Sequence, residues 1–323
     1  MKNTRKEYLK KQKQERIGME KYNNDGELMK VIDYINSHNV IVEFQDECQR
    51  QKSVYWKSFV DGKVRNPIIY ERLGLKKYNK QGCEMEIIQY NTRHDIIVEF
   101  NDGRNTRVHS IWKNFDSGII ENPYYPSVYG VGITGQKYPT SIKGKLVKEY
   151  QTWTTMLKRC YDKTEKELHP TYKDVTCCEK WLLYENFYEW LHSQENFEKW
   201  KNMRRSAIDK DILTKGNKIY SPDTCCLVPS NVNSLFVKRD KERGDLPIGV
   251  IFYKPYNNYR ASCTTDGGCK HLKYCDTPEE AFYVYKEYKE NLIKQIAQEE
   301  YAEGNITKKC YDAMMNYKVE ITD

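Results

Sequence analysis

Three side chains near the middle of the chain are suited to metal chemistry. They lie in the stretch SAIDKDILTKGNKIYSPDTCCLVPSNVNSLF, residues 206–236, whose pattern predicts a strand, a polar turn, a second strand and a short helix. Asp209 and Asp211 follow the first strand, and Asn233 lies in the predicted helix. Carboxylate and amide oxygens are ligands that hard divalent cations such as Mg²⁺ accept. These three residues are therefore the candidate metal ligands.

Positive charge surrounds the two aspartates. Lys210 lies between them, and a lysine is protonated at neutral pH unless burial lowers its pKa, so it does not accept a proton from water. Four further basic residues flank it in the sequence: Arg204, Arg205, Lys215 and Lys218. Such a group suits contact with the phosphate backbone of a nucleic acid. The alternative interpretation is that these side chains only cover a solvated hairpin.

Helices are expected to support this stretch. From Glu149 onward, apolar residues recur at three- and four-residue spacing, and an amphipathic run, WLLYENFYEWLHSQENF, begins at Trp181. We therefore expect a central domain over residues 149–243, in which a strand–strand–helix unit has flanking helices.

This central domain resembles the HNH, or His-metal finger, endonuclease family, which is commonly encoded by phages of low-GC Gram-positive bacteria. The resemblance runs from about Trp153 to Phe236. It is carried by Arg159, Cys160, Tyr172, Trp181, the run Tyr220-Ser221-Pro222-Asp223-Thr224-Cys225, and Asn233. An active member needs a histidine at the end of the first strand as general base, a second group that holds a divalent cation, and an asparagine that orients the histidine.

The resemblance places Lys210 where the catalytic histidine would be. It implies catalytic positions at Asp209, Lys210 and Asn233, with Mg²⁺ as the cofactor if the chain is active. His169 is the alternative base, although a histidine before a proline in a loop is more often a surface or packing residue. We expect a degenerate unit that keeps the family's shape and lacks its base.

The C-terminal part, residues 244–323, has a second signal for DNA. Three short strands are followed by a helix that begins with Thr277 as N-cap, Pro278 and a capping-box Glu280. The pattern resembles the ethylene-response-factor type of DNA-binding domain. The matching residues are Gly249, Val250, Tyr259, Arg260, Ala261, Lys270, Leu272, the run Thr277-Pro278-Glu279-Glu280-Ala281, and Tyr285.

That family places its three-stranded sheet in the DNA major groove, which admits β-strand side chains. The resemblance implies that Arg260 and Lys270 contact bases or phosphates, with Tyr259 and Lys254 beside them. The alternative is that the sheet and helix contact a protein. The chain has few strand arginines and carries three cysteines here, so we expect binding of modest specificity.

The first third of the chain is a tandem repeat. RIGMEKYNNDGELMKVIDY at Arg16 returns as RLGLKKYNKQGCEMEIIQY at Arg72, with an offset of 56 residues. Each copy predicts a small β-rich module, whose core would include Trp56 or Trp112. The expected divisions are a basic leader (1–15), module 1 (16–70), module 2 (71–126), a linker (127–148), the central domain and the C-terminal domain. The fold class is α+β and multidomain.

Composition limits the function classes. Lys and Arg number 53 against 46 Asp and Glu, a net charge of +7, and 27 Tyr and 6 Trp accompany it. This balance suits double-stranded DNA as a partner. The 11 cysteines lack C-x-x-C spacing, and no apolar signal segment or membrane-spanning run occurs. We therefore expect a reduced protein in the cytoplasm of a bacterial host cell that does not associate with a membrane. A structural zinc site is only a minor alternative.

Three functions fit these patterns. The first is a phage-encoded DNA-binding protein with an inactive HNH-like domain. The second is an active, divalent-metal-dependent endonuclease with a homing-like organisation. The third is an interaction protein that binds a host or phage protein and inhibits a host defence component. The long C-terminal helix, with Ile293, Ile296 and Ala297 on one side, either supports a homo-oligomer or packs on its own domain.

Overall fold

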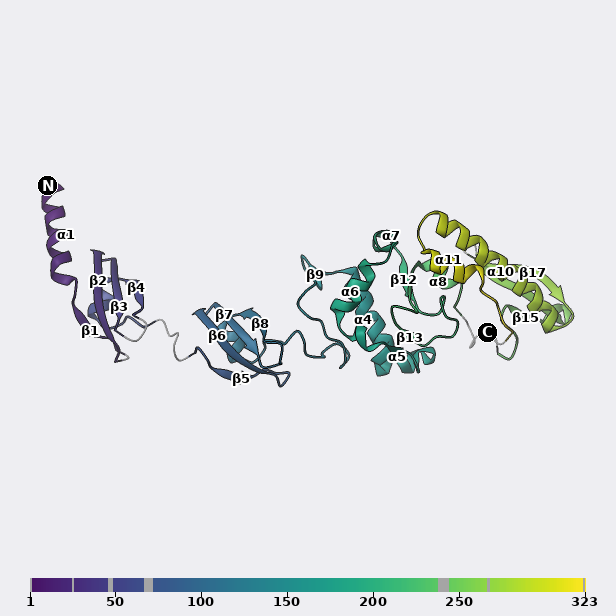
Figure 1. Cartoon of the computed structure of the whole chain (residues 1–323), viewed down its shortest axis with the longest axis horizontal. Coiled ribbons are helices and arrows are strands. Elements are labelled where there is room, and N and C mark those ends of the chain that lie inside the picture. The colour runs from purple at the N-terminus through teal and green to yellow at the C-terminus, as the bar shows by residue number, and fades with distance from the viewer. Residues whose placement is uncertain are drawn as a thin grey trace. The chain divides into compact units, whose positions relative to one another are not determined.

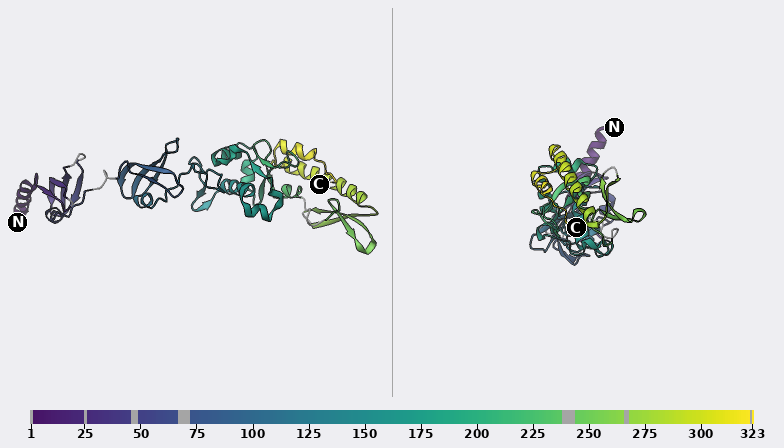
Figure 2. Two further views of the ribbon diagram at one scale, coloured as in Figure 1. Left: turned by 90° about the horizontal axis from the view of Figure 1, so that it is seen from below. Right: turned by 90° about the vertical axis from the view of Figure 1, so that its right-hand side faces the viewer.

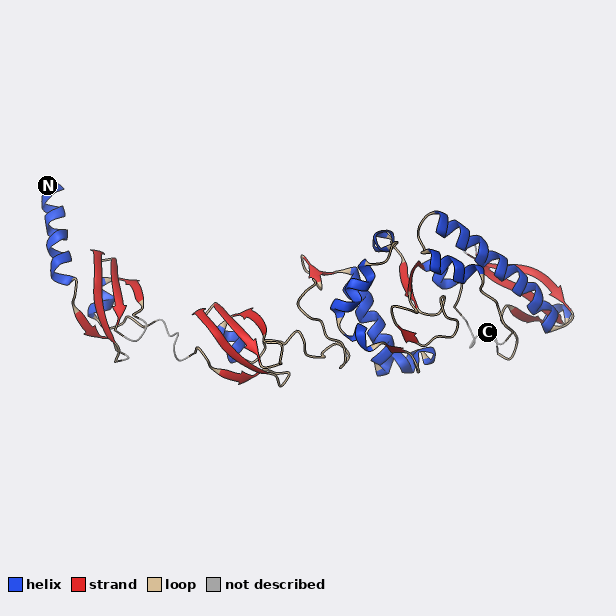
Figure 3. Ribbon diagram, viewed as in Figure 1, coloured by secondary structure: helices blue, strands red, loops and turns tan. Residues whose placement is uncertain are grey.

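A computed structural model describes residues 2–24, 26–45, 49–66, 72–237, 244–265, 268–321 and 323. The chain is α+β, with helices and mostly antiparallel sheets, as the sequence predicted (Figures 1 and 3). It divides into two compact units, Met1–Asn122 and Pro123–Asp323. Among the described residues, no helix is both long enough and apolar enough to span a membrane.

The repeat in the sequence is a repeat of structure. In the first copy the helix α1 (Lys2–Arg16) is followed by an antiparallel sheet of order β1-β2-β3-β4 and a short helix. The elements are β1 (Glu20–Tyr22), β2 (Leu28–Asn36), β3 (Asn39–Phe44), β4 (Gln51–Val54) and α2 (Trp56–Val60). Alternate residues of β2 and β3 are buried, which is the period-2 pattern of a strand with one core face.

The second copy has the same strand order, β5-β6-β7-β8. Its elements are β5 (Lys76–Tyr78), β6 (Glu84–Thr92), β7 (Asp95–Phe100), β8 (Thr106–Ser110) and α3 (Trp112–Asp116). Each copy has a hydrophobic core of its own. Equivalent asparagines also make equivalent hydrogen bonds. The Asn23 side chain donates to the Val64 carbonyl, and the Asn79 side chain donates to the Ile120 carbonyl, in each case 41 residues later.

The tryptophans of the repeat are not core residues in the way that we expected. Phe59 and Phe115 are fully buried, whereas Trp56 and Trp112 are only half-buried. Each indole is covered by the guanidinium of an arginine: Arg16 Cζ lies 4.1 Å from the Trp56 ring centre, and Arg72 Cζ lies 3.7 Å from that of Trp112. These arginines also donate to Tyr34 and Tyr90 at 2.5 and 2.6 Å. A cation–π contact therefore takes the place of complete burial.

Residues 127–148 do not form the free linker that we expected. They include β9 (Ser141–Ile142) and β10 (Lys145–Leu146), and Ile133 forms a β-bridge with Leu183. The backbone N–H groups of Gln136 and Lys137 donate to the Glu185 carboxylate. Prolines and glycines gave this segment the composition of a linker, but its backbone is paired with the central helices.

Helices and short strands make up the centre of the second unit. They are α4 (Lys148–Tyr161), α5 (Lys163–Leu168), η1 (Pro170–Tyr172), β11 (Thr176–Cys177), η2 (Glu179–Leu182), α6 (Tyr184–His192) and α7 (Phe197–Asn202). Trp153, Trp181 and Trp200 are the largest of the fully buried side chains here. The Trp153 and Trp200 indole N–H groups donate to backbone carbonyls at 2.7 and 2.9 Å, so burial leaves no unpaired donor on either ring.

The stretch 206–236 forms the predicted strands and helix. Its elements are β12 (Ser206–Asp209), β13 (Ile219–Tyr220), β14 (Cys226–Pro229) and α8 (Ser230–Ser234). β12 pairs with β14 in antiparallel register, and β13 pairs with β11 in parallel register. Cys225 and Cys226 contribute to two different hydrophobic cores. Burial raises the pKa of the Cys225 thiol to about 12, and its side chain packs in the core that contains Trp153 and Trp181.

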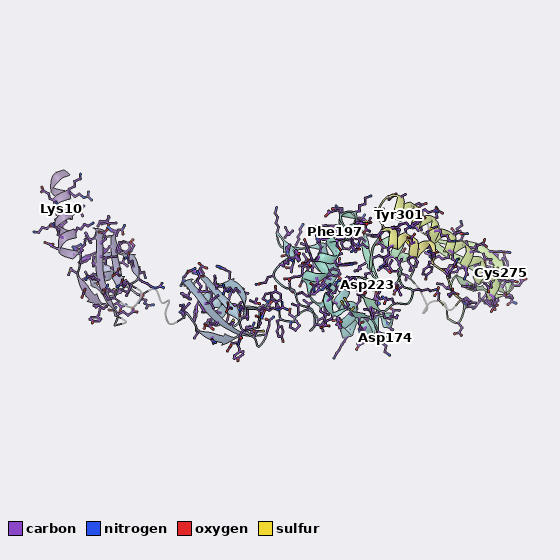
Figure 4. All side chains as sticks on the ribbon, in the orientation of Figure 1. Lys10, Asp174, Phe197, Asp223, Cys275 and Tyr301 are labelled. Atoms are coloured by element: carbon purple, nitrogen blue, oxygen red, sulfur yellow. The ribbon has the colours of Figure 1, made fainter. Side chains whose placement is uncertain are left out.

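Three strands and two α-helices are described in residues 244–323. They are β15 (Val250–Tyr253), β16 (Asn258–Thr265), β17 (Gly268–Cys275), α10 (Pro278–Ala302) and α11 (Lys308–Met315), with the turn η3 (Lys254–Tyr256) between β15 and β16. The first half of α10 runs along one face of the sheet (Figure 2), where Cys275, labelled in Figure 4, is buried with Phe282. The second half of α10, with Ile293 and Ala297, joins α11 on the β12–β14 hairpin. The apolar stripe therefore packs within its own unit.

Gly249 allows α10 to approach β15. Its φ is +78°, and a Cβ built there would lie 2.2 Å from the Tyr285 ring. We expect Gly249→Ala to lower the free energy of unfolding by about 1–3 kcal/mol, because the methyl group adds both backbone strain and a clash. Thermal unfolding measures this change. Gly244→Ala is the matched control, since Gly244 also has a positive φ but nothing within 4 Å. Equal losses in the two variants would contradict a role for Tyr285.

Candidate functional site

The four predicted finger residues line one cleft. Asp209, Lys210, Asp211 and Asn233 surround a space of about 440 Å³ at the end of the β12–β14 hairpin. The sequence placed Asn233 near the two aspartates, and the pairing of β12 with β14 brings α8 to them. The local fold therefore brings the four residues together. Whether they can bind a metal ion depends on the hydrogen bonds and ion pairs that they already make.

Asp209 is engaged by its own turn. Its Oδ1 accepts hydrogen bonds from the backbone N–H groups of Asp211 and Ile212, both at 2.7 Å. Burial raises the pKa of the Asp209 carboxyl, and these two N–H donors offset that effect only in part. The carboxylate thus closes the turn that follows β12.

Lys210 is the buried centre of a cluster of polar groups. Its Nζ lies 2.8 Å from both carboxylate oxygens of Asp211 and donates to the carbonyl of Asn217 at 3.0 Å. The Asn217 side chain donates back to the Lys210 carbonyl at 2.9 Å. Only 7% of Lys210 is exposed. The lysine therefore ties the polar turn between β12 and β13 together.

These residues do not fit a Mg²⁺ site. The Lys210 ammonium already neutralises Asp211, and one oxygen of Asp209 is held by two backbone donors. A divalent cation placed between them would face the lysine charge at close range and would have to displace it. No group of three or more His, Cys, Asp or Glu residues in the described part of the chain is arranged to hold a metal ion.

His169 is not placed to act as a base at this cleft. It lies at the C-terminal end of α5 with its side chain exposed, and its Nε2 is 3.9 Å from Glu165. The neighbouring Tyr172 lines the cleft, but His169 does not. His169 is therefore a surface residue. Its position before Pro170 in the sequence had suggested a surface or packing role as the alternative to a catalytic one.

The basic residues around the hairpin divide into two groups. Arg204 and Arg205 are exposed just before β12 and do not line the cleft. Lys215 and Lys218 do line it, but the Lys215 Nζ is paired with the Asp323 carboxylate at 2.7 Å. Lys218 is exposed. Not all of the charge predicted for phosphate contact is therefore available.

Sequence reasoning did not assign Arg159 and Tyr220 to the site. Both line the cleft, and the Arg159 guanidinium donates to the Tyr220 hydroxyl at 3.3 Å and lies 5.6 Å from the Tyr172 ring centre. These three residues carried the resemblance to the HNH family as motif positions. Their presence in the same family motif was the signal in the sequence that could have placed them together.

A second candidate surface is the face of the C-terminal sheet that turns away from α10. Arg260 lies opposite Ile251 on β15 and Tyr274 on β17, so these three side chains share that face. The Arg260 guanidinium is 5.5 Å from the Tyr253 ring centre. Tyr253, Tyr256 and His271 all lie within 5.5 Å of the Tyr274 ring, measured between centres. The buried Arg260 Nε has no hydrogen-bond partner among the described residues.

Lys270 and Tyr259 lie on the other face of the sheet. Lys270 is paired in register with the buried Cys263, and its Nζ lies 4.9 Å from the Tyr288 ring centre on α10. Tyr259 packs against the core beneath the sheet. Our expectation that these residues would act together with Arg260 on one surface is therefore wrong. Lys254, in η3, is exposed and remains available beside Tyr253 and Tyr256.

Comparison of the chain with models of protein families, with curated proteins and with solved structures finds no match. Support for a function of this chain therefore comes from its own residues and their geometry.

Proposed function

We propose that this protein binds double-stranded DNA through the sheet face that carries Arg260, and that its central domain is an HNH-like unit that does not cut. The observation that carries the proposal is the cluster of one arginine and several rings on the face of β15–β17 opposite α10. Its resemblance to phage HNH proteins and to ethylene-response-factor domains is part of the same proposal.

The chemistry of this face suits a DNA groove. A β-ribbon fits the major groove, where an arginine can donate two hydrogen bonds to guanine O6 and N7. The Arg260 guanidinium lies over the Tyr253 ring on this face, and the exposed Lys254 lies next to Tyr253, where it can contact a phosphate. The neighbouring rings hold the arginine side chain over the sheet and reduce the entropy that binding would cost.

We expect Arg260→Ala to weaken binding to a short duplex by about tenfold, because one specific arginine contact is worth about 1–3 kcal/mol. Lys270→Ala is the matched control: it removes a positive charge from the same sheet but on the α10 side, and should leave affinity nearly unchanged. Fluorescence anisotropy at several salt concentrations measures both. The slope of log affinity against log salt counts the phosphate contacts that each variant retains.

Equal losses in the two variants would mean that general charge, and not this face, drives binding. Unchanged binding by Arg260→Ala, with circular dichroism like that of the wild type, would instead favour a protein partner.

One observation supports that second function, an interaction protein. Both repeat modules expose equivalent apolar residues at their first strand and the turn before it. The pairs are Ile17 and Leu73, Met19 and Leu75, and Tyr22 and Tyr78. Two copies of one module that retain exposed apolar side chains at the same positions offer the same contact surface twice. Copurification of a phage or host protein with the chain from infected cells would test this function.

A further inference from the structure

A large cleft lies on the α10 side of the C-terminal sheet. It has a volume of about 800 Å³, within the range of small-molecule sites. β15 ends its pairing with β16 at Ala261, and the Ser262 N–H donates to the carbonyl of Gly249, so Cys263–Thr265 have no partner from β15 along that edge. The cleft lies beside this edge, with the end of α8 and the middle of α10 as its other walls.

The walls are mainly apolar. They include Leu235 after α8, Ile248 just before β15, Val250 at the start of β15, and Leu292 and Ile296 on α10. Together these side chains would surround the body of an apolar ligand.

One charged residue enters this apolar surrounding. Lys289 is 8% exposed and lines the cleft, yet its ammonium has no ion pair or hydrogen bond with any described residue. The neighbouring lysine on the helix, Lys286, shows the contrast, because it is paired with Glu290 and the Val319 carbonyl. An unpaired buried ammonium is costly, and burial accordingly lowers the pKa of Lys289.

A second polar group in the wall is also unpartnered. Ser262 is 6% exposed, lines the same cleft, and its Oγ has no hydrogen-bond partner among the described residues. Folding alone does not explain why a core position on α10 holds a lysine, since a methionine would fill the same space without the cost. A ligand that brings a negative charge would supply the missing partner.

We propose that this cleft binds an apolar carboxylic acid, with its carboxylate on Lys289 and its hydrocarbon body against Leu235, Ile248, Leu292 and Ile296. Lys289 is the one charged side chain among the described residues that line the cleft, so a single anionic head on an apolar body matches these walls. The inference does not depend on DNA binding, and either can fail without the other.

Decanoate is the probe. Isothermal titration of the full chain should show saturable binding of decanoate at least about tenfold tighter than that of decan-1-ol, which has the same body without the charge. Lys289→Met should remove that difference while keeping the side-chain volume. It should also raise the unfolding temperature of the unliganded protein, because it removes a buried unpaired charge.

Two controls locate the site. Lys294→Met removes a lysine of the same helix that does not line the cleft, and should leave decanoate affinity unchanged. Cys269 lines the cleft and is exposed, so decanoate should slow its alkylation by a maleimide, read by mass spectrometry of that peptide. No saturable binding of decanoate, equal binding of decanoate and decan-1-ol, or unchanged affinity in Lys289→Met would each overturn the proposal.

Discussion

Supercoiled plasmid incubated with the purified protein and Mg²⁺ or Mn²⁺ is expected to remain uncut. A general base contributes about 10²–10⁴-fold to such a reaction, and in the HNH-like unit that we propose Lys210 takes the position of the base. The loss extends to the metal, because Lys210 pairs with Asp211 and the Asp209 Oδ1 is held by two backbone N–H groups. Base and cation site are lost together, so the expected rate lies orders of magnitude below that of an active enzyme.

Agarose gel analysis of nicked and linear forms measures this. Lys210→His returns an imidazole to the base position and frees Asp211, but Asp209 stays in its turn, so we expect weak nicking at most. Robust cleavage by the wild-type chain that disappears in Asp209→Ala or His169→Ala would falsify the prediction and make the protein a metal-dependent endonuclease with a relocated base.

The second large effect is expected in module 2. Phe115→Ala should lower the local stability of that module by about 3–5 kcal/mol, because a fully buried ring is lost from a small core. Trp112→Ala should cost less, since its half-buried indole is covered by Arg72 rather than by the core. Hydrogen exchange of the β6 and β7 amides measures the change. At about 1.4 kcal/mol per tenfold change in protection, the stability loss expected for Phe115→Ala lowers the protection factors about 100-fold or more.

Module 1 is the control within the same molecule, because it has a separate core. Exchange of β2 and β3 should not change in the Phe115→Ala chain. A comparable loss of protection in both modules would show that they unfold as one unit, and no loss in either would show that Phe115 does not stabilise the sheet.

Local signals in the sequence predicted the elements well. The strands of each repeat alternate apolar and polar residues, and Thr277 accepts a hydrogen bond from the Glu280 N–H at the start of α10, as the capping pattern indicated. The finger residues were also placed together, because a hairpin followed at once by a helix brings its two ends to one point. Each of these features depends on residues close together in the chain.

The errors arose where distant residues decide the outcome. Alternation along β17 would place Lys270 on the face of Tyr274, but a bulge between Ala261 and Ser262 shifts the register and turns Lys270 toward α10. Arg16 covers Trp56 across 40 residues of sequence, which no local pattern indicates. Lys289 was likewise not noticed, since a lysine on a charged helix shows its burial only when the sheet is packed against it.

The order of synthesis matters for the core that α10 and α11 share with the β12–β14 hairpin. Asn196 donates to the carbonyl of Asn305, 109 residues later. Val228 of the hairpin and Val232 of α8 pack in one core with Ile293, Cys310 and Met314. At a translation rate of about 5–20 residues per second, roughly 4–16 seconds separate Phe236 from Met314 on the ribosome. During that interval the repeat modules can fold, while the hairpin presents an uncovered apolar side. A nascent chain halted before α11 is thus a natural substrate for chaperones.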